Sequence, residues 1–227
     1  MNQPYLALPV LGRIVVFANL VPLIIALIKH RKPSADMVML LAYLSFSALT
    51  TMCQYYFGEI LGLENLWMSH FFSLLEYQLL ILLYSLWAEN QILKSLLRLS
   101  VIFFAAFWIW AKVNLEKIVQ PAVYTPSVGR LIITCVSLYF IFYFVRQPGL
   151  AIGKSEKFWI TLATLILCAG SLTFFMFRNI IPWLPPHQVL IAFHIHWLNI
   201  IVANGFYSWA ILIEHDRSDI RIVYKTV

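Results

Sequence analysis

Charged side chains are scarce in this sequence. They make up 11% of its 227 residues, whereas hydrophobic residues make up 62%, and the mean hydropathy is +0.82. A soluble domain carries about 25% charged residues. The net charge of +6 is not gathered in a basic run interleaved with aromatics, which would indicate a nucleic-acid-binding surface. The composition therefore predicts an integral membrane protein whose main partner is the lipid bilayer, with no nucleic-acid partner.

Cysteines are also few, and signature motifs are missing. The three cysteines are Cys53, Cys135 and Cys168. Their odd number and wide spacing predict neither a disulfide framework nor a paired zinc motif, and thiols inside apolar runs act as small packing residues. The sequence contains no H-E-x-x-H, G-x-S-x-G or P-loop pattern, so no motif identifies a reaction.

Long apolar segments, by contrast, are abundant. A helix needs about 20 mostly apolar residues to cross roughly 30 Å of hydrocarbon, and the alternating pattern of a membrane barrel is absent. Seven segments qualify: 6–28, 37–57, 66–87, 96–113, 128–145, 158–177 and 189–213. We therefore predict an all-α, polytopic transmembrane bundle of seven spans, with residues 1–227 as a single domain.

The basic residues predict the orientation of the bundle. Eleven of the 16 Lys and Arg lie in four connections on one side: Lys29, Arg31, Lys32, Lys94, Arg98, Arg146, Lys154, Lys157, Arg217, Arg221 and Lys225. The opposite side holds the other five: Arg13, Lys112, Lys117, Arg130 and Arg178. Because the more basic side faces the cytoplasm, the N-terminus is expected outside and residues 214–227 are expected to form a short cytoplasmic tail.

The tail carries a pattern of its own. Ile220, Ile222 and Tyr224 alternate with Arg221, Val223 and Lys225. A period of two is typical of a strand, and an extended segment can add to the sheet of another protein. The pattern predicts that the tail docks a cytoplasmic or membrane protein partner as an added strand.

Glu76 is the outstanding polar residue of the third span, near its middle. At 100° per residue it shares one helical stripe with several polar side chains: Ser69, Ser73 and Tyr84, with His70 and Tyr77 beside them. A buried ionisable group in a membrane is a functional-site hypothesis by default. The stripe is expected to face the bundle, where Glu76 either handles protons, binds a ligand or metal, or is a structural carboxyl.

The first span offers Glu76 one cation, Arg13. Arg13 either extends to the outer headgroups or forms an ion pair with Glu76 or Glu64. Since desolvation favours the neutral carboxyl, we expect Glu76 to be mostly protonated and hydrogen-bonded to His or Asn of the seventh span or to a tyrosine. Asn19 and Pro22 predict a kink in the first span that a neighbouring helix satisfies.

The seventh span holds the other polar cluster. His194, His196, Asn199 and Asn204 all lie within it. H-x-H on a helix is a poor chelate, so no metal is assigned; interhelical hydrogen bonds are the commoner use, and a ligand-binding or proton-relay role is the alternative. No lysine occurs between residues 189 and 213, which excludes a retinal Schiff base, and no other cofactor is predicted.

Two of these segments carry a resemblance. Residues 65–84 contain the pattern N-x-x-x-x-H-x-x-x-x-x-E, and residues 194–209 contain the pattern H-x-H-x-x-N-x-x-x-x-N. With the seven-span pattern, they resemble a loose, uncharacterised group of bacterial seven-helix membrane proteins common in Bacteroidota. The resemblance implies a bacterial inner (plasma) membrane location and no activity.

Four functions remain open at this point. The minimal loops, the outward N-terminus and the absence of a catalytic motif favour a receptor or sensor that binds a small or lipidic ligand between helices and signals to a partner. One alternative is an intramembrane enzyme that uses metal or acid/base chemistry at Glu76, His70, His194 and His196. The others are a proton-coupled transporter that uses Glu76, and a structural or assembly subunit.

Overall fold

The computed structural model describes residues 10–29, 33–63, 65–147, 151–176 and 183–225. Over these residues the chain is helical and forms no strand. Within the same part of the chain, seven stretches are long and apolar enough to cross a membrane. The predicted fold class, an all-α transmembrane bundle of seven spans, is therefore confirmed.

The spans are formed by consecutive helices. The first span is α1 (Val10–Ala18) with α2 (Val21–Lys29). The next five are α3 (Ala35–Tyr55), α4 (Leu66–Trp87), α5 (Gln91–Asn114), α6 (Tyr124–Arg146) and α7 (Glu156–Met176). A π-helical turn, η1 (Tyr56–Ile60), follows α3, and a short 3-10 helix, η2 (Ile152–Lys154), precedes α7. The last is α8 (Pro186–Lys225). Helices α5 and α6 both begin earlier than the predicted spans 96–113 and 128–145, by five and four residues.

Polar residues in the short connections start several helices. The Ser34 hydroxyl accepts a hydrogen bond from the amide of Met37 at the start of α3. The Asn90 side chain accepts from the amide of Ile92 at 2.8 Å at the start of α5. These side chains satisfy amide groups that have no partner in the first turn of a helix.

The first span is broken in the middle, as Asn19 and Pro22 predict. The amide of Leu20 bonds to the carbonyl of Phe17 at 2.9 Å, a tightened turn between α1 and α2. Pro22 has no amide proton with which to continue the ladder. The Asn19 side chain links this break to α3 by donating to the Thr51 hydroxyl at 3.2 Å.

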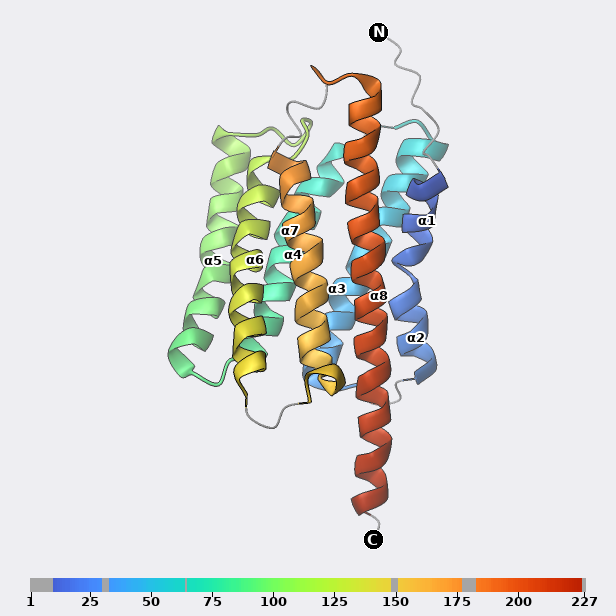
Figure 1. Cartoon of the computed structure of the whole chain (residues 1–227). Helices are drawn as coiled ribbons and strands as arrows, with labels where there is room; N and C mark the ends of the chain where they lie inside the picture. The colour runs from blue at the N-terminus through green and yellow to red at the C-terminus, as the bar shows by residue number, and fades with distance from the viewer. Residues whose placement is uncertain (1–9, 30–32, 64, 148–150, 177–182, 226–227) are drawn as a thin grey trace.

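The helices pack side by side in one bundle (Figure 1). Helix α4 contacts α3, α5 and α6, and α8 contacts α7, α1 and α2. The N- and C-termini lie at opposite ends of the bundle in Figure 1. We call the end that carries the N-terminus and the beginnings of α4, α6 and α8 the N-side, and the opposite end the C-side.

Buried tyrosines join the helices through their hydroxyl groups. Tyr84 of α4 lies 2.7 Å from the Ser137 hydroxyl of α6. Tyr207 of α8 lies 2.9 Å from the Thr164 hydroxyl of α7. Because lipid supplies no hydrogen-bond partner, polar groups between the helices satisfy one another, and these pairs also set which faces of the helices meet.

The structure corrects the prediction for the tail. Helix α8 continues without a break to Lys225, and residues 220–225 are helical rather than extended. It extends beyond the other helices at the C-side end (Figure 1). Adding a turn to an existing helix gains one hydrogen bond per residue, whereas a lone strand has no partner for its backbone, so the period-two pattern is not a strand here.

Candidate functional site

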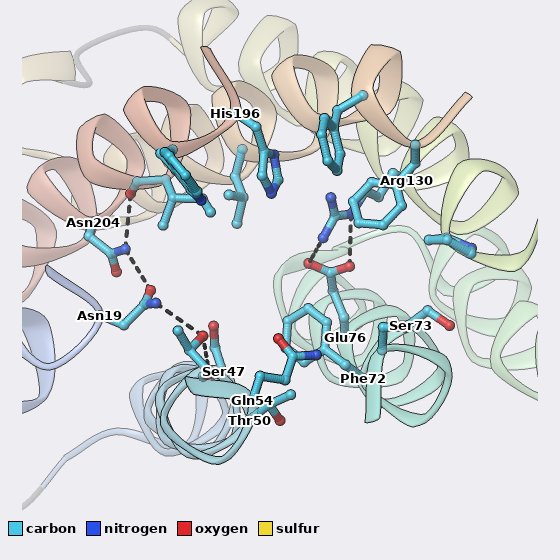
Figure 2. A pocket seen from close by; sticks show the side chains of 18 of the residues that line it. Asn19, Ser47, Thr50, Gln54, Phe72, Ser73, Glu76, Arg130, His196 and Asn204 are labelled. Carbon is cyan, nitrogen blue, oxygen red and sulfur yellow. Dashed lines mark hydrogen bonds and ion pairs between the residues drawn. The ribbon is translucent and has the colours of Figure 1, made fainter. Parts of the chain in front are cut away.

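A cavity of about 270 Å³ opens inside the N-side half of the bundle (Figure 2). Its lining comes from residues 43–54 of α3, 69–76 of α4, 126–130 of α6, 167–175 of α7 and 193–207 of α8, and from Asn19. Helices α3, α4 and α6 contribute mainly polar residues: Ser47, Thr50, Gln54, Ser69, Ser73, Glu76 and Arg130, with Phe72 among them. Helices α7 and α8 contribute an aromatic wall of Phe174, Phe175, Phe193 and Trp197, and α8 adds the polar His196 and Asn204. The cavity therefore combines hydrogen-bonding groups with an apolar wall.

Glu76 and Arg130 form a buried ion pair at this cavity. The Glu76 carboxylate accepts a hydrogen bond from Nε of Arg130 at 3.0 Å and another from Nη2 at 3.1 Å. Glu76 is 2% exposed and Arg130 is 5% exposed. A bidentate pair of this kind is charge-assisted and holds both side chains in one orientation.

The structure thus corrects the prediction for the partner of Glu76. The stripe does face the bundle, as expected, but Glu76 pairs with Arg130 of the fifth span and not with Arg13. Arg13 lies on the exposed face of α1. The two oxygens of Glu76 bind the Arg130 guanidinium, in place of the predicted His or Asn of the seventh span or a tyrosine.

Sequence reasoning missed Arg130 because it placed the start of the fifth span too late. With the span beginning at residue 128, Arg130 lies at the very end of that span, and it counts with the basic residues of the outer side. The helix starts at Tyr124 instead, which places Arg130 nearly two turns inside. The Glu116 carboxylate described below starts the helix there, and no local pattern signals it.

The guanidinium of Arg130 is held on two sides. Its central carbon lies 4.3 Å from the centre of the Phe175 ring, a cation–π contact, and Glu76 lies against its Nε–Nη2 edge. Nη1 is buried and has no hydrogen-bond partner among the described residues. Figure 2 shows the guanidinium projecting from α6 toward the cavity, above the Glu76 carboxylate.

A second polar network lies across the cavity. Asn204 donates through Nδ2 to Oδ1 of Asn19 at 2.8 Å, and Asn19 donates to Thr51. Figure 2 shows this chain linking α8 to α3 through the broken first span. Asn204 therefore lines the cavity and belongs to a network that joins three spans.

The other polar residues of the seventh span lie in three different surroundings. His196 lines the cavity; its Nδ1 lies 3.1 Å from the Ser171 hydroxyl, and its ring stacks on Phe174 at 4.5 Å. His194 is not part of the cavity lining and contacts the edge of Trp197. Asn199 packs against Gly170 of α7, where a β-carbon would lie 2.2 Å from its Nδ2.

His70 belongs to a neighbouring cluster. Its Nε2 lies 2.8 Å from the Gln120 carbonyl, and since a carbonyl only accepts, Nε2 carries the proton. Nδ1 then accepts from the ammonium of Lys112. His70 is fully buried, and these contacts indicate a structural role beside the cavity. The cluster connects to the cavity lining through the hydroxyl groups of Ser73 and Thr125, which lie 3.5 Å apart.

Glu116 organises that cluster from the loop before α6. Its carboxylate accepts from the amides of Val123, Tyr124 and Thr125 at 2.8, 3.0 and 3.2 Å, which caps the positive end of α6. It also pairs with Lys112. Burial raises the pKa of Glu116, but the hydrogen bonds from Lys112, Thr125 and Val123 outweigh it and lower that pKa to about 2.

The candidate metal ligands do not converge. In the described part of the chain, no three His, Cys, Asp or Glu side chains lie close enough together to hold a metal ion. Of the four residues proposed for metal or acid/base chemistry, Glu76 and His196 line the cavity, and His70 and His194 do not.

No protein-family model, curated protein or solved structure matches the chain. This result agrees with the resemblance drawn from the sequence, which is to a group that carries no motif of known chemistry. The fold and the site define the class of the protein: a multi-pass helical membrane protein, with a polar and aromatic cavity between its spans.

Proposed function

We propose that this protein is a receptor-type membrane protein that binds a small molecule in the N-side cavity and passes a shift of its helices to a partner. The observation that carries the proposal is the cavity itself, about 270 Å³ in volume and lined by both polar groups and aromatic rings. Small-molecule sites combine an apolar lining with a few placed polar groups. Following the resemblance, we place the protein in a bacterial inner membrane.

The position of α8 supports a signalling role. Phe193, His196 and Asn204 of α8 line the cavity, and the same helix continues beyond the C-side end of the bundle. A ligand that contacts α8 and α3 together changes the relative stability of their arrangements. A displaced α8 carries that change to the C-side, where a cytoplasmic or membrane protein partner would contact it.

The contacts of the polar residues favour binding over the alternative functions. An enzyme that uses acid/base chemistry needs a group available for proton transfer at the reacting atoms. Glu76 is occupied by Arg130, and His70 contacts Gln120 and Lys112. A carboxylate with a bidentate guanidinium partner is likewise a poor proton carrier, so the transporter hypothesis loses its main candidate.

Two serines on α3 offer a matched test. Ser47 lines the cavity, whereas Ser45 is exposed on the surface of the same helix. We expect Ser47→Phe to fill the cavity and Ser45→Phe to leave it open. Native mass spectrometry of the three proteins, purified from membranes and checked for equal melting temperature, measures what each retains.

The wild-type protein and Ser45→Phe should retain a small molecule that Ser47→Phe lacks. Identical sets of bound molecules in all three proteins would contradict the proposal. The signalling part has its own readout: crosslinking of the C-side end of α8 to membrane proteins should differ between Ser47→Phe and Ser45→Phe, and equal crosslinking would restrict the function to binding.

A further inference from the structure

One nitrogen of the Arg130 guanidinium, Nη1, has no hydrogen-bond acceptor among the described residues. A guanidinium has five N–H donors in a fixed planar fork. Nε and Nη2 donate to Glu76, while Nη1 is buried without an acceptor among the residues that the structure describes. The second edge of the fork, Nη1 with the other proton of Nη2, therefore lacks an acceptor on a residue that lines the cavity.

An unpaired donor of this kind is unfavourable in a membrane protein. A buried N–H without an acceptor loses its hydration and gains nothing in return. Arg130 is 95% buried, since only 5% of it is exposed, and it lines the cavity. An occupant with an oxygen at this edge would satisfy the donor, and the stacking on Phe175 keeps the guanidinium in place for it.

The charges around the cavity indicate whether the oxygen that accepts from Nη1 is anionic or neutral. Arg130 is the one Lys or Arg among the described residues that line the cavity, and Glu76 already compensates its charge. A second anion at this position would be buried without a cation of its own, which is costly at low dielectric. A neutral carbonyl oxygen accepts from Nη1 without that penalty.

The aromatic wall indicates the body of the molecule. Phe174 and Phe193 meet edge to face at 5.0 Å, and Trp197 lies beside Phe193 at 5.5 Å. Such rings favour flat partners that stack or meet their edges. A volume of about 270 Å³ lies near the lower limit for small-molecule pockets, about 300 Å³, and suits a molecule of one or two fused rings.

We infer that the ligand of this cavity is a small planar molecule whose neutral carbonyl oxygen accepts a hydrogen bond from Nη1 of Arg130. The inference rests on the proposed binding function and adds the chemical class of the ligand. Ring stacking against the aromatic wall supplies affinity for the body of the molecule, and Arg130 orients it.

Three probes with one ring system separate these contributions. 2-Methylnaphthalene has no acceptor, 2-acetylnaphthalene carries a neutral carbonyl, and 2-naphthoate carries a carboxylate. Equilibrium dialysis of the protein in nanodiscs measures their binding, with empty nanodiscs correcting for partition into lipid. We expect 2-acetylnaphthalene to bind about tenfold more tightly than 2-methylnaphthalene, the difference made by one hydrogen bond to a charged donor, and more tightly than 2-naphthoate.

The variant Arg130→Lys tests the donor. Lysine keeps the charge opposite Glu76 but ends in a single nitrogen without a second edge. The preference for 2-acetylnaphthalene over 2-methylnaphthalene should fall to about twofold or less, while 2-methylnaphthalene binds as before. The control Arg13→Lys, on the exposed face of α1, should keep the wild-type preference. The wild-type series alone decides the matter if Arg130→Lys does not fold.

The outcomes distinguish the two proposals. Equal saturable binding of all three probes would overturn the carbonyl inference and leave the proposed binding function standing, with water at Nη1. Tightest binding of 2-naphthoate would overturn it in favour of an anionic ligand. Absence of saturable binding by any probe would count against both.

Discussion

The Glu76 carboxylate of α4 and the Arg130 guanidinium of α6 form a bidentate ion pair across 54 positions of sequence. Both residues are almost fully buried, and both line the cavity between the spans. The pair joins the third span to the fifth and gives the cavity its strongest polar feature.

Removing one partner of the ion pair should be worse than removing both. Glu76→Met or Arg130→Met leaves an uncompensated buried charge, which costs about 3 kcal/mol or more, whereas the double variant replaces the pair with apolar packing and costs far less. Reversible unfolding in mixed micelles measures the free energy of unfolding of each variant.

The control for this cycle is Arg13→Met. Arg13 lies on the exposed face of α1, so its replacement should change the unfolding free energy by no more than about 0.5 kcal/mol. Additive losses in the Glu76→Met/Arg130→Met double variant would show that the two side chains do not interact. A loss in Arg13→Met equal to that in Glu76→Met would restore Arg13 as the partner.

The Glu116 carboxylate should make stability depend on pH in acid. Its pKa falls from an ordinary value near 4.5 to about 2 in the folded protein, so the folded state favours the ionised form. Its contribution, about 3 kcal/mol at most, is fully present above about pH 4.5 and is lost as the pH falls toward 2.

Glu116→Gln provides the comparison. The amide cannot ionise, so the variant should be less stable than wild type at pH 6 and should lose less stability between pH 4.5 and 2. Melting temperatures across this range measure both slopes. Parallel curves for the two proteins would assign the acid sensitivity to other groups.

Gly170 leaves room for the side chain of Asn199 where α7 meets α8. A β-carbon there would overlap the side-chain amide of Asn199, so Gly170→Ala forces that side chain out of its present rotamer, at a cost of about 1 kcal/mol. Adding Asn199→Ala removes the obstruction and should restore most of the loss, as measured by thermal unfolding.

Gly205 supplies the matched control on α8. A β-carbon at Gly205 meets nothing within 4 Å, and alanine is favoured over glycine in a helix by about 1 kcal/mol. Gly205→Ala should therefore leave stability unchanged or raise it. If Gly170→Ala behaves in the same way, the contact with Asn199 is not a constraint on packing.

The orientation of the bundle remains a prediction that labelling can test. Gln120 lies in an exposed N-side loop, and Lys154 lies at the exposed C-side end. With the three native cysteines replaced by serine, Gln120→Cys should react with a membrane-impermeant maleimide added outside cells. Lys154→Cys should react only after the membrane is opened, and the reverse pattern would invert the map.

The number of spans and the interior position of Glu76 could be predicted from the sequence. Apolar length alone requires a helix to cross the bilayer, and the polar stripe around Glu76 has no favourable place against lipid. The break at Asn19 and Pro22 followed in the same way, because proline removes a backbone donor wherever it lies in a helix. These features depend on the solvent and on local covalent structure.

The partner of Glu76 was decided only by the tertiary structure. Lipid-facing and core-facing residues are both apolar in a membrane, so periodicity hardly encodes which helices are neighbours or how each is rotated. Arg130 reaches Glu76 because Glu116 caps α6 at Tyr124 and because α4 contacts α6. The prediction of a strand in the tail was wrong for a related reason. The continuing helix α8 satisfies its own backbone hydrogen bonds, whereas a strand needs a neighbouring strand as a partner.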